Sequence, residues 1–289
     1  MGPNPAGSTR RWLVVGHGSV GSFVAERLTR TGSSVSVLDP APRLPIVAGR
    51  AVTSPDDGGY DCVVSCVPPD VAETVPAAVS RALGAGALFF DWNTVSPEMK
   101  RRIAAAIPVG TVDVALLDSV DGGNGHSPRV AVSGADSGRG GKLLSGAGFD
   151  VVYAGPDVGQ AASLKYLRSV FMKTLEALVL EFSALAAGLD SEQIVRGSLT
   201  NNLGTEFSSF MDILLETSRV HAARRANELD DAVASFAAAG TTPDLATAAV
   251  EVLQKAAMAW QDGAPPEGAE PAELAQHLRS ALWGEDGSP

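Results

Sequence analysis

Three glycines at a fixed spacing, Gly16, Gly18 and Gly21, follow the short apolar segment Trp12–Val15. Gly16 permits a tight turn after a strand, and Gly18 lets the backbone come close to a pyrophosphate. Gly21 lets the following helix, 20–31, pack closely on that strand. Because the free N–H groups at the start of a helix hold an anion, this run predicts a dinucleotide site. The expected cofactor-binding residues of the run are Gly16, His17, Gly18, Ser19, Val20 and Gly21, with His17 in a variable slot of the pattern.

Asp39 ends the second apolar segment, 35–39, where the ribose of a dinucleotide would lie. A carboxylate there accepts hydrogen bonds from the ribose hydroxyls and repels a 2′-phosphate, which favours NAD over NADP. Two observations keep NADP open. Asp commonly serves as a turn residue before a proline such as Pro40, and Arg43 is close enough in sequence to meet a phosphate.

Two further polar runs follow apolar segments of the same kind. One is Cys66-Val67-Pro68, and the other is the run 91–97, Asp-Trp-Asn-Thr-Val-Ser-Pro, which follows the segment 87–90. The carboxyl ends of parallel strands meet at one edge of a sheet, where ligands bind. We therefore expect the nicotinamide end of the cofactor near Cys66, Val67 and Pro68. Taken alone, Ser96 and Pro97 also fit ordinary capping of the helix that follows them.

Lys165 lies early in a long segment whose apolar side chains recur at helical spacing, after Gly159. A lysine amine beside a nicotinamide can donate or accept the proton that accompanies hydride transfer, provided that burial and neighbouring charges bring its pKa towards neutral. Lys165 is a candidate for such a role. The alternative is a lysine on the solvent-facing side of an amphipathic helix, which is how we interpret Lys173.

These motifs resemble the β-hydroxyacid dehydrogenase superfamily, the relatives of 6-phosphogluconate and 3-hydroxyisobutyrate dehydrogenases. Members of that superfamily carry an Asp-x-Ser-Thr-x-x-Pro run, and this chain keeps Asp91, Thr94 and Pro97 but has Asn93 where the serine is usual. The resemblance implies that Asn93 and Thr94 lie beside the nicotinamide. It also implies that Lys165 corresponds to the family's catalytic lysine, and it covers roughly residues 12–260.

The resemblance implies a substrate loop at 118–123, since Asp-Ser-Val-Asp-Gly-Gly is similar to the family's Ala-Pro-Val-Ser-Gly-Gly. Gly122 and Gly123 would leave the backbone accessible to a carboxylate. Asp121 replaces the family's serine, and its charge would repel an anionic substrate. Either Asp121 turns outward, or it pairs with a cationic group of an amine-bearing substrate. The expected substrate-binding residues are Asp121, Gly122, Gly123, Arg168 and His221.

Arg168 stands where the family has an asparagine, one helical turn after Lys165. Two cations at this spacing share a helix face, and their repulsion would lower the pKa of Lys165. Alternatively, Arg168 clamps a substrate carboxylate. Farther along, His221 and Arg225 lie one turn apart on an expected helix face. They either reach the substrate or form a solvated basic stripe paired with Glu228.

Short β-like runs alternate with helical stretches in the first half, which predicts an α/β, Rossmann-type, doubly wound and mostly parallel sheet. The runs are 12–15, 35–39, 62–67, 87–91, 112–117, 129–133 and 151–154. The rest reads as an all-α C-terminal domain joined by a long interdomain helix, 158–187, with further helices over 190–202, 204–239 with at least one break, 242–260 and 271–283. The expected domains are a disordered N-terminus (1–10), an NAD(P)-binding Rossmann domain (11–157), a helical substrate and dimerisation domain (158–261) and a tail (262–289).

The long helix has one apolar face with steps of three and four residues. Its members are Leu164, Leu167, Phe171, Leu175, Leu178, Phe182 and Leu185. The helical half is too small to bury all its apolar faces alone, which predicts a homodimer.

Composition limits the partners of the chain. Its 289 residues are 45% hydrophobic, as in a well-packed enzyme, and its net charge of −11 argues against a nucleic-acid partner. No apolar run approaches the roughly 20 residues of a membrane span, and residues 1–10 lack the apolar centre of a signal peptide. We therefore expect a cytoplasmic protein with no membrane partner. The two cysteines, Cys62 and Cys66, are expected to be structural thiols, and the histidines show no metal-ligand spacing.

The function expected from these features is an NAD(P)-dependent oxidoreductase that transfers hydride between the nicotinamide and a small hydroxy-acid-like substrate, with Lys165 as general acid and base. One alternative is an imine reductase, because that group resembles the same superfamily. Asp121 favours this alternative, and retention of Lys165 speaks against it. A second alternative is a protein that binds NAD(H) without catalysis.

Overall fold

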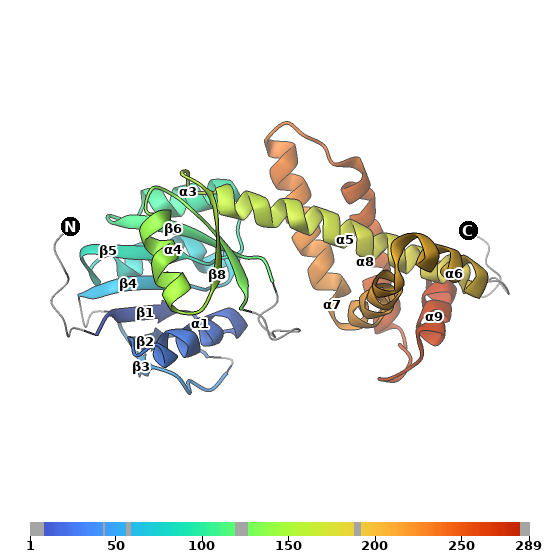
Figure 1. Ribbon diagram of the computed structural model, residues 1–289, viewed down its shortest axis with the longest axis horizontal. Coiled ribbons are helices and arrows are strands. Elements are labelled where there is room, and N and C mark those ends of the chain that lie inside the picture. The colour runs from blue at the N-terminus through green and yellow to red at the C-terminus, as the bar shows by residue number, and fades with distance from the viewer. Residues whose placement is uncertain (1–8, 43, 56–58, 119–126, 188–191, 284–289) are drawn as a thin grey trace. The chain divides into compact units, whose positions relative to one another are not determined.

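The computed structural model describes residues 9–42, 44–55, 59–118, 127–187 and 192–283. The chain forms two compact units, Met1–Lys165 and Tyr166–Pro289. The first unit is an α/β unit, and the second is all helical in its described part (Figure 1). The expected fold class, a Rossmann-type sheet followed by an all-α region, is therefore confirmed.

In its described residues the first unit is built on one eight-stranded sheet in the order β3-β2-β1-β4-β5-β6-β7-β8. The strands are β1 (Arg11–Val15), β2 (Ser34–Leu38), β3 (Arg50–Val52), β4 (Tyr60–Ser65), β5 (Leu83–Asp91), β6 (Gly110–Leu116), β7 (Arg129–Ser133) and β8 (Asp150–Gly155). Neighbouring strands are parallel except for the antiparallel pair β6 and β7. The order of the strands reverses between β1 and β4, and this switch point is where ligands bind in open α/β sheets.

Helices cover both faces of the sheet. They are α1 (Ser19–Arg30), α2 (Val75–Val79), α3 (Pro97–Ala105), α4 (Ser137–Gly146) and a short 3₁₀ helix, η1 (Pro69–Thr74). Because successive side chains of a strand point to opposite faces, β1 contributes to two cores. Trp12 and Val14 pack in the core with residues of α1 and α4, whereas Leu13 and Val15 pack in the core with residues of α2 and α3.

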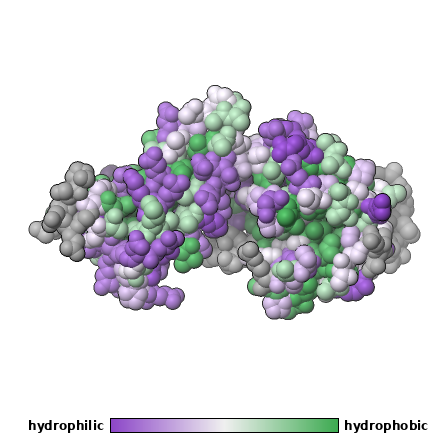
Figure 2. All heavy atoms as spheres, turned by 180° about the vertical axis from the view of Figure 1, so that it is seen from behind, coloured by the Kyte–Doolittle hydropathy of each residue, from purple (hydrophilic) through white to green (hydrophobic). Residues whose placement is uncertain are grey.

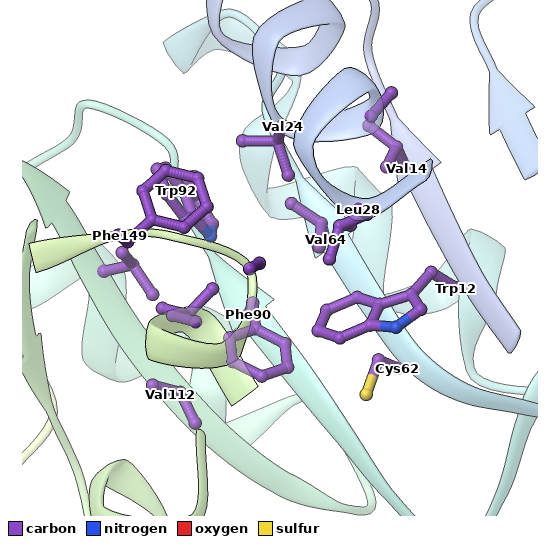
Figure 3. Close-up of a cluster of buried hydrophobic side chains, with 14 of the residues drawn as sticks. Trp12, Val14, Val24, Leu28, Cys62, Val64, Phe90, Trp92, Val112 and Phe149 are labelled. Atoms are coloured by element: carbon purple, nitrogen blue, oxygen red, sulfur yellow. The ribbon is translucent and has the colours of Figure 1, made fainter. Parts of the chain in front are cut away.

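Aromatic pairs lie within the first of these cores (Figure 3). The ring centroids of Trp12 and Phe90 are 5.3 Å apart, and those of Trp92 and Phe149 are 5.2 Å apart. Trp92 follows directly after β5 and is buried. Its ring thus anchors the start of the polar run 91–97 in the core, which fixes where the next residues emerge at the edge of the sheet.

Two features of the fold differ from the expectations. The edge strand β3, Arg50–Val52, was not expected, because it is short, exposed and lacks an alternating apolar pattern. The break expected within 204–239 is wrong, since α7 (Thr205–Ala238) is one continuous helix. The residues of α7 include no glycine or proline that would interrupt it.

The second unit consists of most of α5 (Gln160–Ala186), with α6 (Glu192–Leu203), α7, α8 (Asp244–Gln261) and α9 (Pro271–Trp283). Its core is rich in alanine, which lets the helices approach closely. Alanines from α7 and α8 pack there with Leu180, Leu229 and Leu253, and all three leucines are fully buried.

The apolar face of α5 is largely exposed in the single chain. Leu167, Phe171, Leu178 and Leu185 are between 52% and 67% exposed. The core-facing side of α5 is formed instead by residues such as Ala177, Leu180 and Ala184. The helix is therefore apolar on more than one side, and its own unit covers only part of that surface.

Polar and apolar side chains are interspersed over the face shown in Figure 2. Among the described helices, none is long and apolar enough to cross a membrane.

Candidate cofactor and catalytic site

The turn after β1 depends on two of its glycines. Gly16 has a φ of +91°, and a Cβ atom on it would come 2.4 Å from the backbone oxygen of Cys66. A Cβ atom on Gly21 would come 2.0 Å from the backbone oxygen of Gly16. Side chains at these positions would clash with the backbone, so the turn and the close approach of α1 to the sheet both require glycine.

Gly18 differs from these two glycines, because a Cβ atom on it would meet nothing within 4 Å. It is the N-cap of α1 and supplies no side-chain cap, and Ser19 next to it is exposed. The first N–H groups of a helix lack partners within the helix, and the helix dipole adds positive potential there. The residues present therefore fit a pyrophosphate group at this helix end.

Asp39 follows β2 and is held by two backbone groups. Its Oδ2 accepts a hydrogen bond from the backbone N–H of His17 at 2.6 Å, and its Oδ1 accepts one from that of Ala41 at 2.8 Å. Each carboxylate oxygen can accept a further hydrogen bond. The carboxylate is thus oriented beside the glycine turn with accepting capacity left for a hydroxyl group.

His17 contributes to this arrangement through its backbone. Its side chain is 1% exposed, and its Nδ1 has no hydrogen-bond partner within the described residues. The buried ring of His17 is therefore not on the accessible surface of the turn.

The ends of three central strands are tied together at this edge of the sheet. The backbone N–H of Cys66 donates to the carbonyl of Val15 at 2.8 Å, and that of Trp92 donates to the carbonyl of Ser65 at 2.9 Å. Cys66 and Val67 are half-buried and Pro68 is exposed. Burial raises the pKa of the Cys66 thiol. The structure places all three residues at the carboxyl edge, beside the glycine turn.

Asn93 is buried, and its amide joins two loops. Its Oδ1 accepts a hydrogen bond from the backbone N–H of Val67 at 2.8 Å, and its Nδ2 donates to Ser65 Oγ at 3.0 Å. Its backbone N–H also donates to Asp91 Oδ1 at 3.0 Å. The side chain of Asn93 is therefore engaged within the protein and fixes the loop after β4 against the loop after β5.

Thr94 and Lys165 are brought together from distant parts of the sequence. Lys165 Nζ donates a hydrogen bond to Thr94 Oγ1 at 2.9 Å. Thr94 is exposed at the carboxyl edge, and Lys165 is half-buried in the second turn of α5. A primary amine and a hydroxyl, both able to exchange protons, thus lie side by side at the edge that carries the glycine turn.

Sequence reasoning missed three buried polar residues behind this pair, Lys100, Asp113 and Ser133, each no more than 1% exposed. Lys100 Nζ lies 3.0 Å from Asp91 Oδ1 and 3.2 Å from Asp113 Oδ1. Burial alone would lower the pKa of Lys100, but the two carboxylates raise it above its ordinary value. Burial raises the pKa of Asp91. The sequence signal for this network was Asp113, a charged residue inside the otherwise largely apolar run 111–115.

Three of the expected substrate-binding residues, Asp121, Gly122 and Gly123, lie outside the described residues. The other two belong to the helical unit. Arg168 is exposed on α5, and His221 is half-buried on α7.

The ion pairs of the helical unit correct two interpretations. Arg225 pairs with Glu176 rather than Glu228, so it is not part of a solvated stripe. Lys173 is buried, at 9% exposure, and pairs with Glu228 at 3.0 Å, so it does not lie on a solvent-facing side.

Neither cysteine forms a disulfide, and burial raises the pKa of Cys62 to about 12. Among the described residues, no group of three or more His, Cys, Asp or Glu side chains could hold a metal ion.

Comparison with known proteins identifies relatives of both units. Residues 186–256 match a family described as a domain of unknown function, DUF1932. A curated relative, the uncharacterized 28.5 kDa protein in the 7S RNA 5′ region of Methanothermus fervidus, is 28% identical over 170 residues. That match covers 58% of this chain and 65% of the relative, which is slightly less than two thirds of its length.

Solved structures match nearly the whole chain. A conserved hypothetical protein from Sinorhizobium meliloti 1021 is 23% identical with a TM-score of 0.76, over 95% of this chain and 97% of that one. Conserved protein MTH1747, of unknown function and with structural similarity to 3-hydroxyacid dehydrogenases, is 26% identical with a TM-score of 0.73, over 85% and 96%. The 3-hydroxyisobutyrate dehydrogenase of Mycobacterium tuberculosis, with L-serine, is 18% identical with a TM-score of 0.72, over 94% and 100%.

A more distant structure comes from another class of enzyme. An imine reductase variant from Myxococcus stipitatus, in complex with NAD⁺, is 19% identical with a TM-score of 0.55, over 94% of this chain and 100% of that one. The fold is therefore shared by proteins with more than one chemistry, and the residues of the site must distinguish them.

Proposed function

We propose, from the premise that this chain has the fold of the 3-hydroxyisobutyrate dehydrogenase-like proteins, that it is a nicotinamide-dependent oxidoreductase acting on a small hydroxy-acid-like substrate. The observation that carries the proposal is the contact between Lys165 Nζ and Thr94 Oγ1 at 2.9 Å. It supplies a proton-transferring amine at the edge of the sheet where the glycine turn fits a dinucleotide.

The residues of the turn would hold the cofactor. The N-terminus of α1, with Gly18 open beside it, would bind the pyrophosphate, and Asp39 would bind the ribose hydroxyls. A bound nicotinamide supplies the hydride acceptor or donor. The orientation of Asp39 by His17 N–H supports NAD as the preferred form.

Lys165 would handle the proton of the reaction. When a hydroxyl-bearing carbon loses hydride, the hydroxyl must lose its proton, and the neutral amine of Lys165 accepts it as the carbonyl forms. In the reverse direction the ammonium of Lys165 returns the proton. Thr94 accepts a hydrogen bond from Lys165, which orients the amine and leaves the threonine O–H as a donor for the substrate oxygen.

A homodimer is part of the same proposal. Phe171, Leu178 and Leu185 recur at seven-residue spacing on α5 and are 67%, 60% and 52% exposed. This spacing gives one continuous stripe along a helix and is typical of helices that pair with another helix. A second copy of this chain would cover the stripe.

Turnover assays with pure protein test the enzymatic proposal. Short 3-hydroxy acids and cyclic imines are each assayed with both nicotinamides. We expect turnover of a hydroxy acid, faster with NAD than with NADP. Turnover confined to imines would support the imine reductase alternative instead, and cofactor binding without any turnover would support a non-catalytic NAD(H)-binding protein.

Two lysine variants test the role of Lys165. Lys165→Ala should lower kcat on the order of 10²-fold to 10⁴-fold with little change in the dissociation constant of the cofactor. Lys142→Ala is the matched control, because Lys142 is exposed on α4. Wild-type kcat in Lys165→Ala would contradict the lysine mechanism.

A further inference from the structure

A network of three charged side chains lies inside the first unit. Asp91, Lys100 and Asp113 come from β5, α3 and β6, and each is no more than 1% exposed. Lys100 Nζ lies between the two carboxylates, 3.0 Å from Asp91 Oδ1 and 3.2 Å from Asp113 Oδ1. Burying three charges costs free energy that an apolar core would not, so their presence calls for a role other than stability alone.

One end of this charged network, at Asp91 and Lys100, holds the loop that carries Thr94. Lys100 Nζ donates to the backbone carbonyl of Asp91 at 2.6 Å. Asp91 Oδ1 in turn accepts a hydrogen bond from the backbone N–H of Asn93 at 3.0 Å. The ammonium and the carboxylate together fix the backbone of the three residues that lead into Thr94.

The other end holds the start of the helix that carries Lys165. Asp113 Oδ2 accepts hydrogen bonds from the backbone N–H groups of Gly159 at 2.9 Å and Ala162 at 3.2 Å. Ser133 Oγ donates to the same oxygen at 2.9 Å and accepts from the N–H of Ala161 at 3.0 Å. The first turn of α5 is thus capped by side chains from β6 and β7.

Gly159 explains why this helix needs an external cap. Its φ is +100°, and a Cβ atom on it would come 2.9 Å from the backbone oxygen of Pro97. A side chain that could cap the helix from this position is therefore excluded. The same close approach sets the start of α5 directly against the start of α3, which follows the loop of Thr94.

The charges of the network also suit the helix end. Two carboxylates against one ammonium leave a net negative charge, and the N-terminus of α5 offers the positive end of a helix dipole beside Asp113.

We propose that Asp113 and Lys100 are positioning residues that set the amine of Lys165 against Thr94. The ammonium of Lys100 binds Asp91 at the end of β5 and also binds Asp113, whose other carboxylate oxygen caps α5. Through Asp113, the loop after β5 and the first turn of α5 are fixed relative to each other. This inference rests on the proposed function for its catalytic consequence, but the placement of Lys165 can be measured without a substrate.

Two substitutions of Asp113 separate positioning from folding. Asp113→Asn keeps a side-chain oxygen that can cap the helix, but its NH₂ group then faces the ammonium of Lys100, so kcat should fall by less than in Asp113→Ala. Asp113→Ala removes the cap, and kcat should fall on the order of tenfold or more. The dissociation constant of the cofactor should change little in either variant, because the glycine turn is untouched.

Val79→Ala is the control for stability, since Val79 is fully buried at the end of α2 and has no polar group that could join the network. All variants are assayed well below their unfolding temperatures. Equal kcat in wild type, Asp113→Asn and Asp113→Ala would overturn the proposal. A loss of kcat in Val79→Ala as large as that in Asp113→Ala would also overturn it, because general destabilisation would then explain the effect.

A second measurement reports on Lys165 directly. The chain has five lysines, at positions 100, 142, 165, 173 and 255, so reductive methylation with [¹³C]formaldehyde gives few NMR signals. The signal of Lys165 is assigned by its absence in Lys165→Ala. Its titration midpoint should move more in Asp113→Ala than in Asp113→Asn.

The turnover assay and the NMR titration test the proposed function and the positioning proposal separately. If no substrate is turned over, the proposed function fails, and the NMR titration alone decides whether the network places Lys165. If Lys165 titrates identically in all three proteins, the positioning proposal is overturned even in an active enzyme.

Discussion

Asn93 Oδ1 accepts a hydrogen bond from the backbone N–H of Val67 at 2.8 Å, and this contact joins the loop after β5 to the loop after β4. Serine, the residue usual at this position in the resembling family, is too short to span the same gap. In Asn93→Ser the N–H of Val67 loses its partner in a partly buried place. We expect the free energy of unfolding to fall by about 1–3 kcal/mol, as measured by urea denaturation.

Glu98→Gln is a suitable control for Asn93→Ser, because Glu98 is exposed on the neighbouring helix α3. The cofactor should also bind more weakly to Asn93→Ser, since the loop of Cys66 is no longer held. An unchanged urea midpoint in Asn93→Ser would show that the two loops are held together by other contacts.

The glycines of the turn should respond differently to the same added methyl group. Gly18→Ala places the new Cβ in open space and should leave the unfolding temperature near the wild-type value. It should raise the dissociation constant of NAD on the order of tenfold, because the methyl group stands where the pyrophosphate approaches. Fluorescence titration with NADH and thermal unfolding measure the two effects.

Gly21→Ala is the contrasting case. Its Cβ would come 2.0 Å from the backbone oxygen of Gly16, so either α1 or the turn must move. We expect a large drop in unfolding temperature together with loss of cofactor binding. If Gly18→Ala and Gly21→Ala behaved alike, the close approach of α1 to the turn would not be what requires glycine at Gly21.

Asp39 should set the preference between the two nicotinamides. Asp39→Ser removes the negative charge that would repel a 2′-phosphate, while its hydroxyl can still accept one of the two backbone N–H groups. The ratio of the dissociation constants for NADP and NAD should shift towards NADP on the order of tenfold. Asp61→Ser is the control, because Asp61 also accepts a backbone N–H, that of Arg11, but lies near the start of its strand. An equal shift in both variants would point to net charge rather than to Asp39 itself.

Local sequence patterns were sufficient for the parts of the fold that depend on neighbouring residues. The apolar strand before Gly16 and the glycine spacing predict the turn, because each requirement acts within a few residues of the chain. The long helix around Lys165 was predicted for the same reason, from apolar side chains at helical spacing.

Contacts between distant segments were not accessible in this way. Asp113 lies in an apolar strand, and nothing in its neighbourhood indicates that it caps a helix that begins at Gln160. The pairing of Arg225 with Glu176 instead of Glu228 likewise depends on how α5 and α7 pack. Helical periodicity also predicts that α5 has an apolar face, but not that Phe171 and Leu178 would remain exposed in the single chain.

Glu228 should make the stability of the helical unit depend on pH. Burial alone would raise the pKa of Glu228, but the charges of Lys173 and Arg224 outweigh it and leave the pKa below its ordinary value of 4.5. The unfolded chain then binds more protons than the folded chain just below pH 4.5, so the stabilisation is present above that pH. It is lost as the pH falls through the pKa of the folded state.

Urea denaturation across the acidic range tests this dependence. Glu228→Gln should be less stable than wild type near neutral pH, and the difference should shrink as the pH is lowered below 4.5. Glu251→Gln is the control, since Glu251 is exposed on α8. A difference between Glu228→Gln and wild type that is constant with pH would mean that the effect comes from packing and not from charge.

The exposed stripe of α5 predicts how the proposed homodimer can be separated. Phe171 and Leu178 are 67% and 60% exposed in the single chain, so replacing one of them with a charged residue costs little within the unit itself. In a dimer the same side chain would be buried against a second copy, where an unpaired charge is strongly unfavourable. Leu178→Glu should therefore give a monomer by light scattering. Its unfolding temperature should fall only by the amount that loss of the partner subunit explains.

Val220→Glu distinguishes a specific interface from general effects of charge. Val220 is 78% exposed on α7 and does not belong to the seven-residue repeat of α5. It should leave the mass of the assembly unchanged, while Leu178→Glu halves it. A monomeric wild-type protein would contradict the proposed dimer outright. Dissociation by both variants would place the interface on α7 as well, because a contact confined to the stripe of α5 would not respond to Val220.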